Sequence, residues 1–191
     1  MHNDFDYEVQ LIDFKLYQNE IIELRNFCWN EFNSEVVSEE FYSKQDEIED
    51  LSSIHCGIIQ ENKLVATNRL QLVNSIDELP YSSNFKDSKV ENSKWLTYKY
   101  KDDDYVVLES PVAGTGRLVV HPDYRKRGIS KLILTYWIKV AQERNIKSLL
   151  SYPSPWMVKE LLELGFSFEK NLKGVFKPLP TIDLALVTMK F

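Results

Sequence analysis

The segment from residue 116 to residue 152 constrains the fold more than any other part of the chain. It begins with a strand-like stretch, Gly116 to Val120, and continues through a basic turn into a helix predicted over Ser130 to Arg144. A short apolar strand is predicted after it, over Lys147 to Tyr152. The helix is predicted because its apolar residues recur at three- and four-residue spacing, which gives it one buried face. A strand, a helix and a second strand of these lengths predict parallel strands joined by a right-handed crossover.

The turn that opens this helix has the composition of an anion-binding site. It reads Arg125-Lys126-Arg127-Gly128-Ile129-Ser130. The first turn of a helix carries unpaired N–H groups and a partial positive charge. Glycine lets an anion approach the backbone without a Cβ in the way, and arginine can bind phosphate through two hydrogen bonds. The alternative is a basic turn that only keeps a surface loop in water.

The composition indicates one globular domain and disfavours nucleic acid and membrane as partners. The chain has 191 residues, of which 43% are hydrophobic and 27% are charged, and its net charge is −6. This length fits one domain with a sizeable core. The acidic balance leaves no broad basic surface for nucleic acid, so the basic turn is a local exception. No apolar run approaches the ~20 residues that span a membrane, and the acidic N-terminus does not resemble a signal peptide.

The cysteines and histidines predict neither a disulfide framework nor a metal centre. Cys28 and Cys56 lack the spacing of metal ligands, and we expect free, partly buried thiols in a reducing cytoplasm. His2, His55 and His121 are scattered along the chain, which disfavours a zinc site.

The rest of the chain predicts a mixture of helices and strands. One helix is expected with Asn19 as its N-cap and a second from Ser38. A third is expected over Pro155 to Leu164, with Pro155 in its first turn and Gly165 after its end. Further strands are expected at Tyr7–Ile12, His55–Ile59, Lys63–Val73, Tyr105–Leu108, Phe166–Lys170 and Leu184–Lys190.

Two stretches of the chain carry more specific expectations. In Lys63–Val73, apolar residues at alternate positions predict a strand with one buried face. Between residues 74 and 104 the pattern breaks for about thirty residues, which is longer than most connections in a compact domain. The aromatic content of this segment disfavours plain disorder, so it is either an insertion with a function or a mobile surface loop.

The motifs and the order of elements resemble the GNAT superfamily of N-acyltransferases. Val120 to Ser130, Val-His-Pro-Asp-Tyr-Arg-Lys-Arg-Gly-Ile-Ser, is similar to the acyl-CoA-binding motif of that family, with Ser130 where glycine or alanine is usual. Leu164-Gly165-Phe166 resembles a second signature, where a helix turns into a late strand. The resemblance implies an α/β (α+β) fold with a mixed central sheet of about seven strands and helices on both faces. It also implies a single domain over residues 1–191, with an inserted segment at 74–104 that is a candidate for part of the acceptor pocket.

The resemblance implies that acetyl-CoA, or another acyl-CoA, is the co-substrate. In the family, backbone groups of the strand before the basic turn pair with the pantetheine arm, and the pyrophosphate lies on the N–H groups that open the helix. The side chains of this strand can pack in the core at the same time, because the backbone groups and the side chains have different partners. The cofactor-binding residues implied here are Leu118, Val119, Val120, Arg125, Lys126, Arg127, Gly128, Ile129, Ser130 and Ser154.

The chain departs from the family at the positions of the acid and the base. The glutamate that many relatives use as a general base aligns with Gly114, and the tyrosine that many use as an acid aligns with Leu161. The nearest candidates for the catalytic groups are Glu109 and Tyr152. Alternatively, Glu109 is a solvated carboxylate at the end of a strand, and the ring of Tyr152 only packs against its neighbours. Ser154 replaces the usual asparagine at the start of the helix before the second signature.

Arg117 leads to a second functional alternative. The run Gly116-Arg117-Leu118-Val119-Val120-His121-Pro122 resembles a GNAT subgroup that includes acyl-homoserine lactone synthases and N-acyl amino acid synthases. Enzymes of that subgroup use long acyl chains. We expect Arg117 either to pair with an acidic neighbour such as Glu109 or to contact the acceptor. His121 is expected to be a turn residue.

The leading hypothesis is a cytoplasmic N-acetyltransferase that transfers an acetyl group from acetyl-CoA to a primary amine of a small molecule or peptide. One alternative is transfer of a longer acyl chain to an amino acid or related amine, as in the synthases named above. The alternative from another class is a non-catalytic acyl-CoA-binding module. The acidic balance favours a cationic amine acceptor. No nucleic acid, membrane or metal is expected as a partner, and a homodimer is left open.

Overall fold

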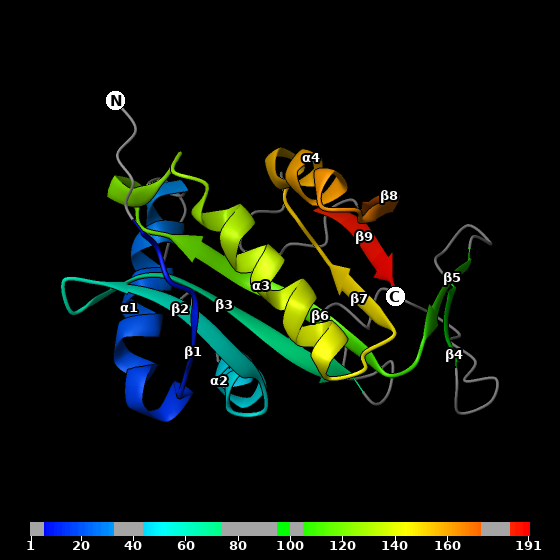
Figure 1. Ribbon diagram of the computed structural model, residues 1–191, viewed down its shortest axis with the longest axis horizontal. Helices are drawn as coiled ribbons and strands as arrows, with labels where there is room; N and C mark the ends of the chain where they lie inside the picture. The colour runs from blue at the N-terminus through cyan, green and yellow to red at the C-terminus, as the bar shows by residue number, and fades with distance from the viewer. Residues whose placement is uncertain (1–5, 33–43, 74–94, 100–104, 173–183) are drawn as a thin grey trace. The chain divides into compact units, whose positions relative to one another are not determined.

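The computed structural model describes residues 6–32, 44–73, 95–99, 105–172 and 184–191 (Figure 1). The elements in chain order are β1 (Gln10–Ile12), α1 (Phe14–Phe32), α2 (Lys44–Leu51), β2 (Ile54–Gln60), β3 (Lys63–Val73), β4 (Trp95–Lys99), β5 (Tyr105–Glu109), β6 (Val112–Val120), the 3-10 turn η3 (Pro122–Tyr124), α3 (Ile129–Glu143), β7 (Ser148–Ser151), α4 (Pro155–Glu163), β8 (Ser167–Leu172) and β9 (Leu184–Lys190). Seven strands form one mixed sheet in the order β1-β2-β3-β6-β7-β9-β8, and β4 and β5 form a two-stranded sheet. The predicted α/β class and its seven-stranded sheet are confirmed.

The chain forms two compact units, and each is built from two segments. The first unit contains Met1–Arg69 and Arg117–Tyr136, and the second contains Leu70–Gly116 and Trp137–Phe191. The elements β3, β6 and α3 each contribute residues to both units.

In the first unit, α1 packs its apolar face into the core. Ile21, Leu24 and Cys28 recur at helical spacing and are buried. They belong to one cluster with Leu64 of β3 and Val119 of β6. The buried face of α1 is therefore formed by apolar residues at helical spacing.

The start of α1 differs from the prediction. The helix begins at Phe14, because the carboxylate of Asp13 accepts the N–H of Lys15 at 2.9 Å and caps the first turn. Asn19 therefore lies inside the helix, and its assignment as N-cap was wrong. The backbone angles of Tyr17 are not helical, so a kink separates the first turn of α1 from the apolar residues that follow.

The strand β3 is buried on both faces. Every residue from Leu64 to Gln71 is buried, and only Lys63 and Leu72 of the strand are exposed. The expectation of a single buried face was wrong, because β3 lies inside the sheet order and is covered on both sides. Its polar residues have partners within the protein: Thr67 Oγ1, for example, donates to the carbonyl of Cys56 at 3.0 Å.

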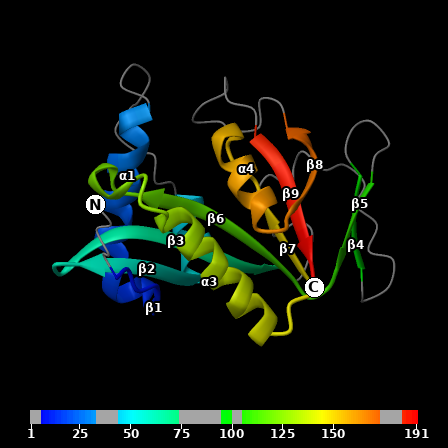
Figure 2. The same ribbon diagram turned by 45° about the horizontal axis from the view of Figure 1, so that its top comes forward.

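In the second unit, β7 pairs in parallel with β6 and antiparallel with β9. The parallel pair confirms the prediction that the chain returns through a helix to a neighbouring parallel strand. The helix α4 packs against β8 and β9 and buries Leu161 (Figure 2). The predicted bounds of Lys63–Val73 and Leu184–Lys190 are those observed.

Before the basic turn, the structure differs from the prediction at β6 and β4. The strand β6 begins at Val112, four residues before its predicted start at Gly116, because Val112 to Thr115 pair with β7. The strand β4 was not predicted and pairs with β5. The expected helix start at Ser38 and most of the 74–104 segment lie outside the described residues, and the described helix α2 begins at Lys44.

Candidate functional site

The strand β6 extends beyond its pairing with β7. The parallel register runs from Val112↔Ser148 to Thr115↔Ser151, and β6 then continues to Val120. A strand that continues past its last pair offers backbone groups to another extended chain, as in β-strand addition. The predicted pantetheine-binding residues, Leu118, Val119 and Val120, belong to this extension.

The backbone of β6 is irregular where the extension begins. Arg117 has a φ of +59°, which is rare for a residue other than glycine. Its guanidinium donates a hydrogen bond to the carboxylate of Asp46 in α2. The predicted salt bridge of Arg117 is therefore confirmed, but Glu109 as its partner was wrong.

The basic turn follows η3 and contains two residues with left-handed backbone. The ring nitrogen Nδ1 of His121 accepts the N–H of Asp123 at 3.3 Å and caps η3, which confirms His121 as a turn residue. Lys126 and Gly128 have φ values of +61° and +77°. Glycine adopts this conformation without a steric cost. Among the described residues, no atom lies within 4 Å of the position that a Cβ on Gly128 would occupy.

The arginines of the turn hold its shape with their own side chains. Arg125 Nε donates to the carbonyl of Val120 at 3.0 Å. Arg127 Nη2 donates to the carbonyl of Asp123 at 2.7 Å, and its Nη1 donates to the hydroxyl of Tyr7 at 3.0 Å. The turn is therefore fixed by internal hydrogen bonds while Arg127 remains exposed at the surface.

The first turn of α3 supplies N–H groups next to these charges. The first hydrogen bond of the helix runs from the N–H of Leu132 to the carbonyl of Gly128 at 3.0 Å. The N–H groups of Ile129, Ser130 and Lys131 precede that bond and carry the positive end of the helix dipole. The predicted residues Leu118–Val120 and Arg125–Ser130 thus form one continuous strand–turn–helix whose chemistry suits a phosphate.

The other predicted site residues lie in the second unit. Ser154 is the N-cap residue of α4, but its side chain makes no capping hydrogen bond. Tyr152 is half-buried and directly follows β7. Glu109 is half-buried at the end of β5, and its N–H donates to Ser148 Oγ at 2.9 Å.

Glu109 and Tyr152 lie at opposite ends of β7. Glu109 contacts Ser148, the first residue of β7, whereas Tyr152 follows its last residue. Four residues of extended chain span roughly 13 Å, so these two side chains do not form one hydrogen-bonded pair. Tyr152 is at the end of β7 where its register with β6 stops, and Glu109 is at the end where this register begins.

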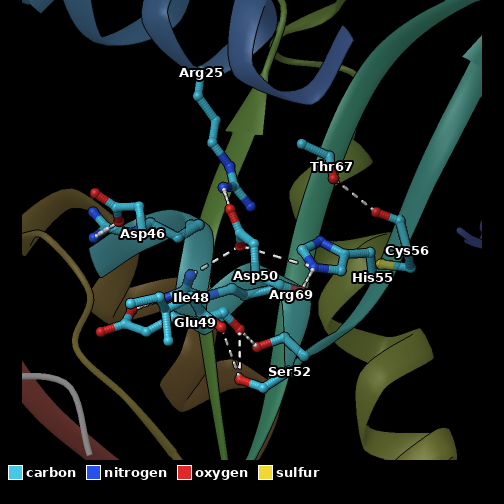
Figure 3. Close-up of polar contacts among 12 residues, drawn as sticks. Arg25, Asp46, Ile48, Glu49, Asp50, Ser52, His55, Cys56, Thr67 and Arg69 are labelled. Atoms are coloured by element: carbon cyan, nitrogen blue, oxygen red, sulfur yellow. Dashed lines mark hydrogen bonds and ion pairs between the residues drawn. The ribbon is translucent and has the colours of Figure 1, made fainter. Parts of the chain in front are cut away.

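A buried charge cluster in the first unit was not predicted. Asp50 of α2 forms ion pairs with Arg25 of α1 and with Arg69 of β3, and Arg69 also pairs with Glu49 (Figure 3). The Arg69 Nη1 to Asp50 Oδ1 distance is 2.9 Å. The Nε2 atom of His55 lies 2.9 Å from the carbonyl oxygen of Asp50. Arg25 and Asp50 are fully buried, so this cluster lies within the core of the unit.

The pKa values in the cluster follow from burial and pairing. Burial alone would raise the pKa of Asp50, but Arg25 and Arg69 outweigh it and hold this pKa below its ordinary value. Burial alone would lower the pKa of Arg69, but Asp50 and Glu49 outweigh it and raise this pKa. Burial, assisted by the two arginines, lowers the pKa of His55 in spite of Asp50. We therefore treat Asp50 and Arg69 as charged and His55 as neutral at pH 7.

The sequence contains a signal that could have identified this cluster. Asp46, Glu49 and Asp50 recur at the spacing that places residues on one face of a helix. Arg25 lies within the apolar stripe of α1, and Arg69 lies within a strand of buried residues. Charges at such positions require partners, because an unpaired buried charge is costly.

Two further properties of the described residues bear on function. No described group of three or more His, Cys, Asp or Glu side chains is placed to hold a metal ion. None of the helices in the described part of the chain is both long enough and apolar enough to cross a membrane.

Comparison with known proteins identifies the family. A sequence model of the Acetyltransferase (GNAT) family matches residues 19–154, which begin within α1, include the strand–turn–helix and end directly before α4. The chain therefore belongs to the acetyltransferase (GNAT) family and is an N-acetyltransferase of that type. No curated protein sequence matches the chain.

Several solved structures share the fold of this chain. The chain is similar to the ribosomal-protein-alanine N-acetyltransferase from Brucella melitensis, with a TM-score of 0.64 and 12% identity over 96% of this chain and 99% of that one. It is also similar to an N-acetyltransferase from Staphylococcus aureus Mu50, with a TM-score of 0.61 and 12% identity over 97% and 98% of the two chains. A third similar structure is yncA from Salmonella typhimurium, solved with its cofactor acetyl-CoA, with a TM-score of 0.63 and 11% identity over 97% and 94%. At these identities the likeness shows the fold alone.

Proposed function

We propose that this enzyme transfers an acetyl group from acetyl-CoA to a primary amine of a small molecule or peptide. The observation that carries the proposal is the continuous strand–turn–helix from Leu118 to Ser130. A strand edge suits an extended pantetheine arm, and N–H groups beside positive charges suit a pyrophosphate. The residues present therefore fit the co-substrate that the family uses.

The binding roles follow from the position of each residue in this segment. The backbone groups of Leu118, Val119 and Val120 would pair with the pantetheine arm, although the Val120 carbonyl already accepts bonds from Arg125 and Cys28. The N–H groups from Arg127 to Ser130 would bind the pyrophosphate. Arg125 and Lys126 would add positive charge. Ser154, at the start of α4, is proposed as a further contact because its hydroxyl does not cap the helix.

In the proposed reaction the amine nitrogen attacks the thioester carbonyl carbon. A C–N bond forms, the C–S bond breaks, the amine loses a proton and the leaving thiolate gains one. We propose Tyr152 as the acid, because it follows Ser151, the last residue of β7 that pairs with β6. Glu109 remains the candidate base, since Gly114 provides no carboxylate. If Tyr152 and Glu109 do not act as acid and base, positioning of the two reactants would supply the larger part of the rate enhancement.

We also propose that residues 1–191 act as one GNAT domain in the cytoplasm, with residues 74–104 as an insertion that shapes the acceptor pocket. The passage of β3, β6 and α3 through both compact units supports a single domain. The two cysteines are free and buried, which is compatible with a reducing compartment.

An assay of thiol release tests the proposed function. The purified chain would be incubated with acetyl-CoA or a medium-chain acyl-CoA and a panel of polyamines, amino acids and short peptides, and free CoA thiol would be measured. We expect amine-dependent release that is faster with acetyl-CoA. Faster release with the longer chain would instead support the acyl-amino-acid alternative, and no release with any amine would contradict the proposal.

Variants of the two candidate groups extend this assay. Removal of a positioned acid or base typically lowers kcat by about 10² or more. We expect Tyr152→Phe to lower kcat on this scale and Glu109→Gln to have a smaller effect, because Glu109 is at the end of β7 opposite to Tyr152. A larger effect of Glu109→Gln would reverse the assignment.

A further inference from the structure

An arginine occupies the one position of β6 at which the backbone is left-handed. Arg117 has a φ of +59°, a conformation that glycine adopts freely and arginine rarely does. Gly114 and Gly116 occur in the same strand, yet the left-handed position carries a long charged side chain. Contacts of the side chain at residue 117 can therefore offset the steric cost of this left-handed conformation.

Two helices of the first unit hold the Arg117 side chain. Its Nη2 atom donates to Asp46 Oδ1 of α2, and its Cζ atom lies 5.3 Å from the centre of the Trp29 ring of α1. The side chains of Asp46 and Arg117 are only 7% and 24% exposed. An ion pair that is largely removed from water is screened less than a surface pair and is more restricted in geometry. The direction of the Arg117 side chain is thus fixed by α1 and α2 together.

The helix α2 is itself fixed without the help of Arg117. Asp50 and Glu49 are on the same helical face as Asp46 and form the buried ion pairs with Arg25 and Arg69 (Figure 3). Those pairs connect α2 to α1 and to β3. The carboxylate of Asp46 is therefore a rigid anchor and not a mobile surface group.

The anchored residue lies at the start of the proposed donor-binding edge. Arg117 is two residues after Thr115, the last residue of β6 that pairs with β7, and directly before Leu118. A residue with left-handed backbone bends an extended strand and so changes the direction of the residues that follow it. The conformation of residue 117 therefore determines where the backbone groups of Leu118 to Val120 point.

We propose that Asp46 and Arg117 form a positioning pair that orients the donor-binding edge of β6. Arg117 acts through the backbone that follows it and makes no contact with the acyl donor. This proposal rests on the proposed function, because it assigns the pair to the acetyl-CoA site. It identifies α2 as the element whose position controls donor binding.

The test compares single and double variants of this pair. Asp46→Asn removes the charge of the anchor, and Arg117→Gly removes the side chain while permitting the observed φ. Glu47→Gln is the matched control, since it removes a half-exposed carboxylate from the same helix. For each protein, the Kd of acetyl-CoA is measured by calorimetry, the KM of the amine by the thiol assay, and the Tm by thermal denaturation.

We expect both single variants to raise the Kd of acetyl-CoA on the order of tenfold, which is the scale of coupling between residues in contact. The double variant should be no worse than either single variant, because both remove the same ion pair. The KM of the amine should stay within about twofold, and Glu47→Gln should bind acetyl-CoA as the wild type does.

Three results would overturn the proposal. If the variants lower the Tm but leave the Kd unchanged, the pair only stabilises the fold. If they raise the KM of the amine instead of the Kd, Arg117 contacts the acceptor. If Arg117→Gly binds like the wild type, the backbone conformation suffices and the anchor is unnecessary. A wild-type protein that does not bind acetyl-CoA would refute the proposed function itself, and this result is distinct from the other three.

Discussion

Replacing Asp50 with asparagine tests whether the buried charge cluster stabilises the first unit. The side chain of Asp50 is fully buried, and its two oxygens accept hydrogen bonds from Arg25 and Arg69. Asparagine has nearly the same size but no charge, so two guanidinium groups would remain buried with a single carboxylate, that of Glu49, nearby. Removal of one partner from a buried ion pair costs about 3–5 kcal/mol. For a chain of this size, about 2–4 °C of Tm is lost per kcal/mol, so we expect a decrease of roughly 6–20 °C.

A surface pair provides the matched control for this prediction. Lys139 Nζ and Glu143 Oε1 in α3 are 3.8 Å apart, and their side chains are 73% and 61% exposed. Solvent screens such a pair, so Glu143→Gln should change the free energy of unfolding by less than about 0.5 kcal/mol. Both variants would be measured at pH 7 by urea denaturation, followed by circular dichroism, and by thermal denaturation. A loss of less than about 1 kcal/mol for Asp50→Asn would refute the claim that the cluster depends on this charge.

Two further predictions concern titratable groups in the core. Because the pKa of His55 is lower in the folded protein than its unfolded value of about 6.5, the unfolded state binds a proton first as the pH falls, so the free energy of unfolding should decrease below about pH 6.5. The variant His55→Gln should show a weaker decrease between pH 7 and pH 5, and an unchanged slope would contradict the prediction. Cys28 and Cys56 are buried, and burial raises the pKa of the Cys56 thiol, so a thiol reagent should react slowly with the native protein and quickly in urea. Rapid labelling of the native protein would show that these thiols are accessible.

The strand–turn–helix that is proposed to bind the donor could be predicted as structure because its signals are local. A strand, a basic turn with glycine and an amphipathic helix follow one another within about thirty residues, and each has its own periodicity or composition. The backbone at Gly128 is left-handed, as a turn glycine would suggest. The helix and strand bounds after this glycine agree with the prediction to within one or two residues, which is the usual uncertainty at the ends of elements.

The charge cluster could not be predicted in the same way. Its charged residues belong to three elements: Arg25, Glu49, Asp50 and Arg69. A local sequence pattern does not indicate which arginine pairs with which carboxylate. The spacing of the acidic residues is that of one helical face, but a solvated face has the same spacing.

The start of α1 and the partner of Arg117 were missed for related reasons. Asp13 and Asn19 are both suitable N-cap residues, and the apolar stripe that begins at Ile21 favoured the later one. Glu109 is closer to Arg117 in sequence than Asp46 is, but Asp46 is brought to it by the packing of α2. In both cases tertiary structure decided between residues that were locally equivalent.

Acetyl-CoA binding by the wild type and by the double variant Arg125→Ala/Arg127→Ala tests the central claim most directly. The measurement is isothermal titration calorimetry, with Lys139→Ala in the exposed part of α3 as the control. Loss of charge-assisted hydrogen bonds and of the internal bonds that fix the turn should cost ~2 kcal/mol or more, which is roughly a thirtyfold increase in Kd. We expect this increase in the Kd of acetyl-CoA for the double variant, and a Kd equal to that of the wild type for the control. Equal affinity of all three proteins would contradict the assignment of the basic turn as the donor-binding site.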